Sequence, residues 1–275
     1  MTGSSEAASG RLSRSIWLMY HDVFRTRPTL GLSKHTRIYH VSARLFAKHL
    51  DVIQSSGRRV LAVGDCLTSG KASGDAVVLT FDDGWQGTCD VAVPLLLERG
   101  WRATIFVTKD FVGRSGFVSA STLRAVADAG MEIGVHGVTH RMLSGCSRAE
   151  VVEEFRACRE YLESLLGRAV QQASAPGGDT TPTVVDGAIE AGLQSLSTSR
   201  PGINSPNTPL FDLRRVAIKE DSSADDVSRF CRFRLGRERA RWMLMQMPRT
   251  LLGMERYAMV RRWLLDGANG KARSS

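Results

Sequence analysis

The stretch Asp75-Ala-Val-Val-Leu-Thr-Phe-Asp-Asp-Gly84 decides the fold class. Its first seven residues form a nearly continuous apolar run, a pattern that is typical of a strand buried on both faces. Such strands belong to parallel sheets that are covered by helices, because a parallel pair needs a crossover connection. We therefore expect an α/β fold, provided that helical patterns separate the neighbouring strands.

The rest of the chain supplies that alternation. Further strands are expected at residues 15–20, 102–107, 131–135, 169–174 and 194–198. Helices are expected at residues 42–56, 89–99, 121–129, 147–166 and 183–191. The boundaries of the fourth helix are the clearest, because Ser147 and Glu150 form a capping box and Gly167 ends it. Residues 200–210 are rich in Pro and Asn and predict an irregular loop.

Composition excludes several classes of protein. Apolar residues make up 43% of the 275 residues and charged residues 24%, as in a folded globular protein. The formal charge is +9, but residues 229–262 alone carry ten Arg and two Glu, so the remainder is nearly neutral. This distribution does not favour a nucleic-acid-binding domain. The five cysteines form no C-x-x-C pair, and no signal-peptide core or membrane span is evident, so we expect a cytoplasmic protein.

Acidic and imidazole side chains follow two of the expected strands. Asp82 and Asp83 come directly after residues 75–81, and His136 and His140 follow residues 131–135. The carboxyl ends of parallel strands meet at one edge of a sheet, so these side chains are expected to converge. One carboxylate and two imidazoles leave positions open on a metal ion, which is typical of a catalytic site. The alternatives are an Asp that caps the following helix and an incidental pair of histidines.

These residues resemble the motifs of the polysaccharide deacetylases with a NodB-homology domain, which form carbohydrate esterase family 4. Thr80–Gly84 matches T-F-D-D-G, and residues 136–140 resemble H-[S/T]-x-x-H with Gly137 in place of Ser or Thr. Residues 172–178 lie where the third motif, R-P-P-Y-G, is expected. The resemblance covers roughly residues 14–220 and implies an irregular (β/α)7-type barrel.

The resemblance also implies roles for individual residues. The ligands of a divalent metal, usually zinc, would be Asp83, His136 and His140. Asp82 would be the general base that activates water, and a backbone N–H of Gly177 or Gly178 would help to hold the oxyanion. The substrate would be an N-acetylated glycan that loses its N-acetyl groups by hydrolysis. Apart from the resemblance, the aromatic ring of Trp85, directly after Asp82-Asp83-Gly84, is expected either to stack on a sugar ring or to pack against a neighbouring helix.

Two departures from the family pattern need other residues. The Arg of the third motif is missing, and Ser174 and Ala175 occupy its aligned positions. Arg215 is the candidate to orient the base, ahead of Arg214, although both could also form a solvated surface pair. No His follows residue 140, so the usual late L-x-x-H motif, whose His protonates the leaving amine, is absent.

An L-x-x-H sequence does occur at the other end of the chain, as Leu18-Met-Tyr-His21. A subgroup of exopolysaccharide deacetylases is similar in beginning with a Y-H strand, as if the barrel were circularly permuted. His21 would then be the general acid. The alternative is a His that is hydrogen-bonded within a loop.

The sequence divides into three regions. Residues 1–14 are expected to be a flexible tail, residues 15–220 the deacetylase barrel, and residues 221–275 a basic, Arg-rich helical extension that is broken at Pro248. The apolar face of the extension is expected to pack on the barrel, and its Arg face could contact an anionic membrane from the cytoplasmic side.

The function predicted from these features is removal of N-acetyl groups from an amino-sugar polysaccharide or its lipid-linked precursor. Two alternatives remain at this point. One is a deacylase that uses the same site on a small amide. The other is a catalytically weakened protein that binds glycan or acts as a scaffold.

Overall fold

The computed structural model describes residues 12–26, 34–69 and 74–244. Contacts between Cα atoms divide the chain into two units, Met1–Arg234 and Leu235–Ser275. The first unit contains the sheet and every residue of the expected site.

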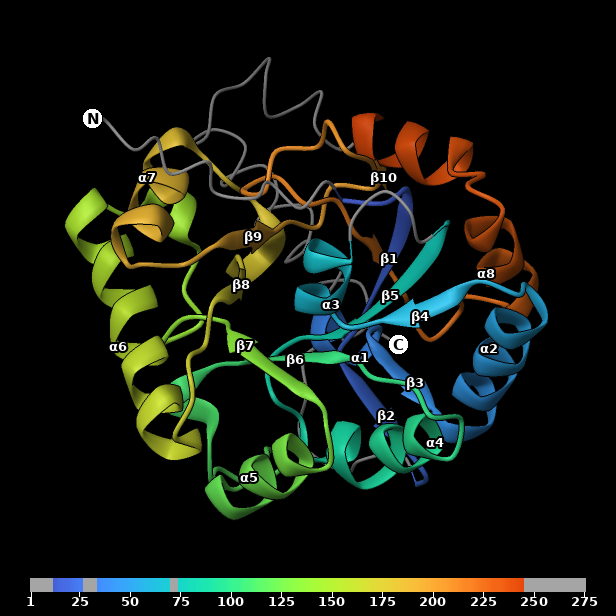
Figure 1. Cartoon of the computed structure of the whole chain (residues 1–275), viewed down its shortest axis with the longest axis horizontal. Helices are drawn as coiled ribbons and strands as arrows, with labels where there is room; N and C mark the ends of the chain where they lie inside the picture. The colour runs from blue at the N-terminus through green and yellow to red at the C-terminus, as the bar shows by residue number, and fades with distance from the viewer. Residues whose placement is uncertain (1–11, 27–33, 70–73, 245–275) are drawn as a thin grey trace, which may run out of the picture. The chain divides into compact units, whose positions relative to one another are not determined.

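The first unit is built on a nine-stranded sheet with the path β10-β1-β5-β6-β7-β8-β9 (Figure 1). Along this path the strands are β10 (Ile203–Asn204), β1 (Ser15–Tyr20), β5 (Ala76–Phe81), β6 (Thr104–Val107), β7 (Glu132–Val135), β8 (Gln172–Ser174) and β9 (Ser195–Ser197). Two further strands lie off the path: β4 (Arg59–Leu61) pairs with β5, and β11 (Val216–Ala217) pairs with β1. Each of these pairings is parallel except that of β10 with β1.

The sheet curls into an incomplete barrel. Ser197 of β9 forms an isolated parallel bridge with Leu213. Shortly afterwards, β11 (Val216–Ala217) pairs with β1. The segment 213–217 therefore spans the gap between β9 and β1. This arrangement confirms the expected α/β fold with an irregular barrel.

Helices cover the outer face of the sheet (Figure 1). They are α2 (Ala43–Ser55), α4 (Val93–Leu97), α5 (Ala120–Asp128), α6 (Arg148–Leu166), α7 (Pro182–Glu190) and α8 (Ala224–Cys231). Two short helices, α1 (Lys34–Arg37) and α3 (Val63–Thr68), lie elsewhere. A π-helical turn, η2 (Thr88–Ala92), leads into α4. The capping box of α6 is present, and Gly167 ends this helix in the left-handed conformation that glycine adopts most easily.

Strands β1 and β5 form the centre of the core. All six residues of β1 pair in register with all six of β5, from Ser15 opposite Ala76 to Tyr20 opposite Phe81, and all twelve are buried. Helix α3 lies against the amino ends of the neighbouring strands, where the N–H of Val63 donates to Thr104 Oγ1 at 2.8 Å. The carboxyl ends of the strands therefore remain for the site. A separate two-stranded parallel sheet, β2 (Asp22–Phe24) with β3 (His40–Ser42), follows β1.

The boundaries of the barrel are wider than the sequence predicts. The last residues of the expected tail belong to the fold, because Leu12 packs in an apolar cluster with Trp17 and Val78, and Arg14 forms an ion pair with Asp75. Residues 1–11 of that tail lie outside the described residues.

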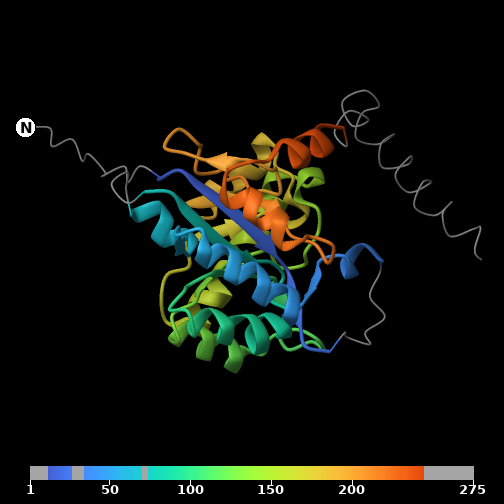
Figure 2. The same cartoon turned by 90° about the vertical axis from the view of Figure 1, so that its right-hand side faces the viewer.

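The expected C-terminal extension begins later than residue 221. Helix α8 belongs to the first unit and lies beside α2 (Figures 1 and 2), because Val227, Phe230 and Cys231 form a buried apolar stripe on it. In the second unit residues 236–244 are helical. The second expected helix and Pro248 lie outside the described residues, so the predicted membrane contact remains a prediction. None of the helices in the described ranges has the length and apolarity that a membrane crossing requires.

Candidate active site

The loop after β5 presents two carboxylates to the interior of the barrel mouth. Asp82 and Asp83 are 3% and 6% exposed, and Asp83 has a positive φ of 76° that a non-glycine residue rarely adopts. Neither carboxylate is recorded as accepting from a backbone N–H of the helical turn that follows, which begins at Gln86 and continues into η2. The capping alternative for these residues is therefore wrong.

Asp83, His136 and His140 converge. Asp83 Oδ1 lies 3.3 Å from Nε2 of His136 and 3.1 Å from Nε2 of His140, and one ligand atom from each residue lies within 4.8 Å of the other two. Among the described residues, no well-aligned hydrogen bond reaches this buried oxygen. One carboxylate oxygen and two imidazole nitrogens that point at a common space form a donor set that fits a divalent cation such as zinc.

The orientation of His136 is fixed from behind. Its Nδ1 lies 3.0 Å from the backbone carbonyl oxygen of Ser174 and 2.5 Å from Ser174 Oγ. The carbonyl can only accept, so Nδ1 carries the proton and Nε2 keeps its lone pair for a metal. A second partner of this kind is characteristic of histidines that bind metals in proteins.

Arg215 lies on the segment that spans β9 and β1, and it contacts Asp82 with both terminal nitrogens. Nη1 donates to Asp82 Oδ1 and Nη2 to Oδ2, each at 2.7 Å, while Nε donates to the Thr198 carbonyl at 2.9 Å. The guanidinium is completely buried. Arg214 packs beside Gly202 instead. The structure thus brings Arg215 to Asp82, and the surface-pair alternative is wrong for Arg215.

This contact contributes to the charge state of Asp82. Burial raises the pKa of its carboxyl group, but the charge and hydrogen bonds of Arg215, together with the nearby His136 and His21, outweigh burial, so the pKa is lowered. Asp82 is therefore ionised at neutral pH and able to accept a proton. The adjacent Asp83 carboxyl is also ionised, since its imidazole neighbours lower its pKa well below the ordinary value despite burial.

His21 follows β1 at the level of Asp82, because Tyr20 pairs with Phe81. Its ring is half-buried and lies 4.5 Å from the ring of Tyr39, centroid to centroid. Burial lowers the pKa of His21, against the opposing influence of the Asp83 and Asp82 carboxylates. Its buried Nδ1 has no hydrogen-bond partner among the described residues, so the alternative of a hydrogen-bonded loop His is not what the structure shows.

Trp85 has a different environment from either of the expected ones. The side chain is 4% exposed, stacks on Phe117 at 4.2 Å between ring centroids, and meets the His40 ring edge-on at 4.6 Å. Its Nε1 donates to Asp83 Oδ2 at 3.0 Å. A buried ring offers no face to a sugar, so the stacking prediction is wrong; Trp85 instead orients the carboxylate of Asp83.

The two glycines of the third motif differ in their hydrogen bonding. Both have positive φ values, 69° for Gly177 and 70° for Gly178. The N–H of Gly178 donates to the carbonyl of Ala175 at 2.8 Å within its own turn, so Gly177 is the remaining candidate for the oxyanion.

Sequence reasoning did not find three buried polar residues near the site, which are Asp22, His40 and Glu154. Asp22 Oδ2 and His40 Nδ1 are hydrogen-bonded at 2.9 Å, and the His40 ring meets Trp85 edge-on. Glu154 is buried beneath the loop that carries the two histidines. The available signal for Glu154 is its position on α6, on the same face as the buried residues Val151 and Cys158, where a charge is unexpected.

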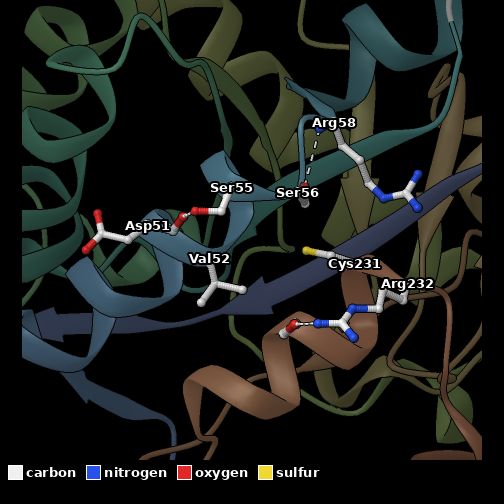
Figure 3. Close-up of a pocket in the computed structure, with 8 residues that line it drawn as sticks. Asp51, Val52, Ser55, Ser56, Arg58, Cys231 and Arg232 are labelled. Carbon is white, nitrogen blue, oxygen red and sulfur yellow. Dashed lines mark hydrogen bonds between the residues drawn. The ribbon is translucent and has the colours of Figure 1, made fainter.

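A hollow elsewhere in the first unit contains none of the expected site residues. It lies between α2 and α8, and Figure 3 shows its lining side chains. These are Asp51, Val52, Ser55, Ser56, Arg58, Ser228, Cys231 and Arg232.

Comparison with known proteins agrees with this geometry. The family model for polysaccharide deacetylases matches residues 69–196, which include the loops after β5, β7 and β8. This part of the chain resembles the polysaccharide deacetylases. His21 and Arg215 lie outside the matched residues, so two side chains reach the candidate site from beyond the part that the family model covers.

Similar proteins include YxkH of Bacillus subtilis, a protein assigned to the polysaccharide deacetylases, which is 24% identical over 187 residues. That alignment covers 66% of this chain and 67% of YxkH. A chitooligosaccharide deacetylase of Bradyrhizobium is 31% identical over 138 residues, covering 47% of this chain and 61% of the relative. The matches thus span about two thirds of these relatives.

Two solved structures have the same fold. The deacetylase PplD of Streptococcus pyogenes has a TM-score of 0.70 at 21% identity, with 80% of this chain and 99% of that chain covered. IcaB of Ammonifex degensii has a TM-score of 0.67 at 24% identity, with 79% and 97% covered. These neighbours confirm the NodB-type deacetylase fold.

Proposed function

We propose that this protein is a metal-dependent hydrolase that removes N-acetyl groups from an amino-sugar polysaccharide or its lipid-linked precursor. The observation that carries the proposal is the convergence of Asp83, His136 and His140 beside the Arg215–Asp82 pair. The chitooligosaccharide deacetylase among the relatives supports an N-acetylated sugar as the substrate class.

A divalent metal, most commonly zinc for this donor set, would be held by Asp83, His136 and His140. When bound, such an ion supplies Lewis-acid polarisation of the amide carbonyl and lowers the pKa of water toward ~7. The buried oxygen of Asp83 and the fixed tautomer of His136 support this assignment.

The remaining residues move protons and hold charge. Asp82, ionised and clamped by Arg215, accepts a proton from the attacking water. The N–H of Gly177 donates to the oxyanion that develops on the amide, an interaction worth roughly 2.7–4 kcal/mol of barrier.

The leaving amine needs a proton, since an amine cannot depart as an anion. His21 is the donor, because it stands level with Asp82 and its Nδ1 has no other partner among the described residues. Action at the cytoplasmic face of a membrane, through the Arg-rich C-terminal helices, remains part of the proposal.

Acetate release from N-acetylglucosamine oligomers by the zinc-loaded protein tests the function. We expect acetate from the wild type and a fall of roughly 10²-fold or more in Asp82→Asn, which loses the base. Asp128→Asn, an exposed change on α5, is the matched control and should leave turnover unchanged. Bound zinc without acetate release would favour a small amide substrate or a binding role.

A separate variant tests the acid. His21→Ala should lower turnover while leaving zinc binding unchanged, since the imidazole is not a ligand in this account. Unchanged turnover would refute its role as proton donor.

A further inference from the structure

Glu154 is a buried carboxylate that the proposed chemistry does not use. It lies on α6 and is 3% exposed, on the face where Val151 and Cys158 pack against the barrel. A charge removed from water is unfavourable unless it is fully hydrogen-bonded or paired. The hydrogen-bond and ion-pair partners of Glu154 therefore indicate its role.

All of its recorded partners belong to one loop. Oε2 accepts from the N–H groups of Val138 at 2.7 Å and Thr139 at 2.9 Å. Oε1 accepts from Thr139 Oγ1 at 2.6 Å and pairs with Arg141 Nε at 3.1 Å. These residues lie between or directly beside the proposed ligands His136 and His140. One carboxylate thus fixes the loop that separates the two imidazoles.

The loop needs such support because its backbone is unusual. Gly137 has a φ of +78° and His140 a φ of +62°, and the left-handed region is unfavourable for a residue with a side chain. This conformation turns the His140 ring so that its Nε2 lies 3.1 Å from Asp83 Oδ1. A relaxed loop would lose that approach.

The glycine at position 137 belongs to the same arrangement. A Cβ atom on Gly137 would lie 3.0 Å from Glu154 Oε2, closer than ordinary contact. The Glu154 carboxylate therefore occupies the space beside Gly137, the position at which the family motif H-[S/T]-x-x-H carries Ser or Thr.

We propose that Glu154 is a positioning residue for the metal site, which sets metal affinity by holding the His136–His140 loop in its ligating conformation. The inference rests on the proposed function, because it concerns the same metal. Glu154 lies outside the motifs. Its side chain makes four polar contacts with the loop, and none of these four contacts is with the side chain of a proposed metal ligand.

The test is zinc affinity, measured by competition with a chromophoric chelator on folded protein. Glu154→Gln keeps one oxygen for the two N–H groups but loses the charge that pairs with Arg141; we expect a Kd about tenfold weaker, and weaker still for Glu154→Ala. Glu153→Gln, the exposed neighbour on α6, is the matched control and should bind zinc as the wild type does.

A second measurement separates positioning from a purely structural role. Urea unfolding of the metal-free variants reports the stability of the fold by itself. Weaker zinc binding by folded Glu154→Gln supports the inference. Lower stability with unchanged zinc affinity in both Glu154 variants would overturn it while leaving the proposed function intact. A wild-type protein that binds no zinc would overturn the proposed function as well, so the two failures are distinguishable.

Discussion

Replacement of Arg215 with Met tests whether the buried ion pair between Arg215 and Asp82 stabilises the fold and orients Asp82. Arg215 has no exposed surface, and Asp82 is 3% exposed, so neither group is solvated when its partner is removed. The substitution keeps an unbranched side chain in the barrel and removes both 2.7 Å bonds to Asp82, as well as the bond from Nε to the Thr198 carbonyl.

The expected loss follows from the charge left behind. Truncation of one partner of a buried ion pair destabilises proteins by about 3–5 kcal/mol, because the other charge stays in a low-dielectric interior. We place Arg215→Met in this range, since both oxygens of Asp82 lose a charged donor. A double variant, Arg215→Met with Asp82→Asn, removes the stranded charge and should recover a large part of the loss.

The assay is urea unfolding followed by tryptophan fluorescence, with the wild type, both single variants and the double variant compared at the same pH. Acetate release is measured in parallel and should fall in Arg215→Met, because Asp82 loses the group that orients it. The reasoning would be refuted if Arg215→Met lowered the free energy of unfolding by less than about 1 kcal/mol, or if the losses of the two single variants simply added in the double variant. Either result would mean that the two buried charges do not stabilise each other.

Three further predictions concern other groups. Trp85→Phe removes the hydrogen bond to Asp83 Oδ2 and should weaken zinc binding with little change in the far-UV circular dichroism spectrum; equal affinity would contradict the orienting role. Hydrogen bonds from Arg14 and then Arg58 hold the pKa of Asp75 at about 2, below its ordinary 3.8, so the stability they provide is complete above about pH 4 and is lost as the pH falls toward 2. In Asp75→Asn the free energy of unfolding should therefore fall by about 1 kcal/mol less between pH 4 and pH 2 than in the wild type. An equal fall in both proteins would contradict the pairing. Of the five cysteines only Cys146 is partly exposed, and burial raises the pKa of Cys66 to about 11 and that of Cys158 to about 12. A thiol reagent should therefore modify one cysteine of the native protein. Rapid labelling of four or more cysteines would contradict this burial.

The sequence predicts local elements of this protein well because their signals are local. The apolar run of β5 and the capping box of α6 each lie within a few residues, and both elements appear where they are expected. The convergence of Asp83 with His136 and His140 was also predictable, since parallel strands place their carboxyl ends at one edge.

Contacts between distant residues were harder to predict. Arg215 is 133 residues from Asp82, and its position depends on the short segment that spans β9 and β1, which carries little periodic signal. The burial of Trp85 depends on Phe117, from the segment before α5, and on His40, the first residue of β3. Neither contact is visible in the sequence, so the position of Trp85 directly after the motif suggested stacking on a sugar ring instead. Glu154 was missed because a charged residue in an amphipathic helix is usually exposed.

The most direct test of the central claim is the zinc content of the purified protein after dialysis against metal-free buffer and then buffered zinc. The account predicts one equivalent in the wild type and a large loss in folded His136→Ala, with the exposed change Asp128→Asn retaining the full equivalent. Equal zinc content in the wild type and His136→Ala, or none in the wild type, would contradict a metal site formed by Asp83, His136 and His140.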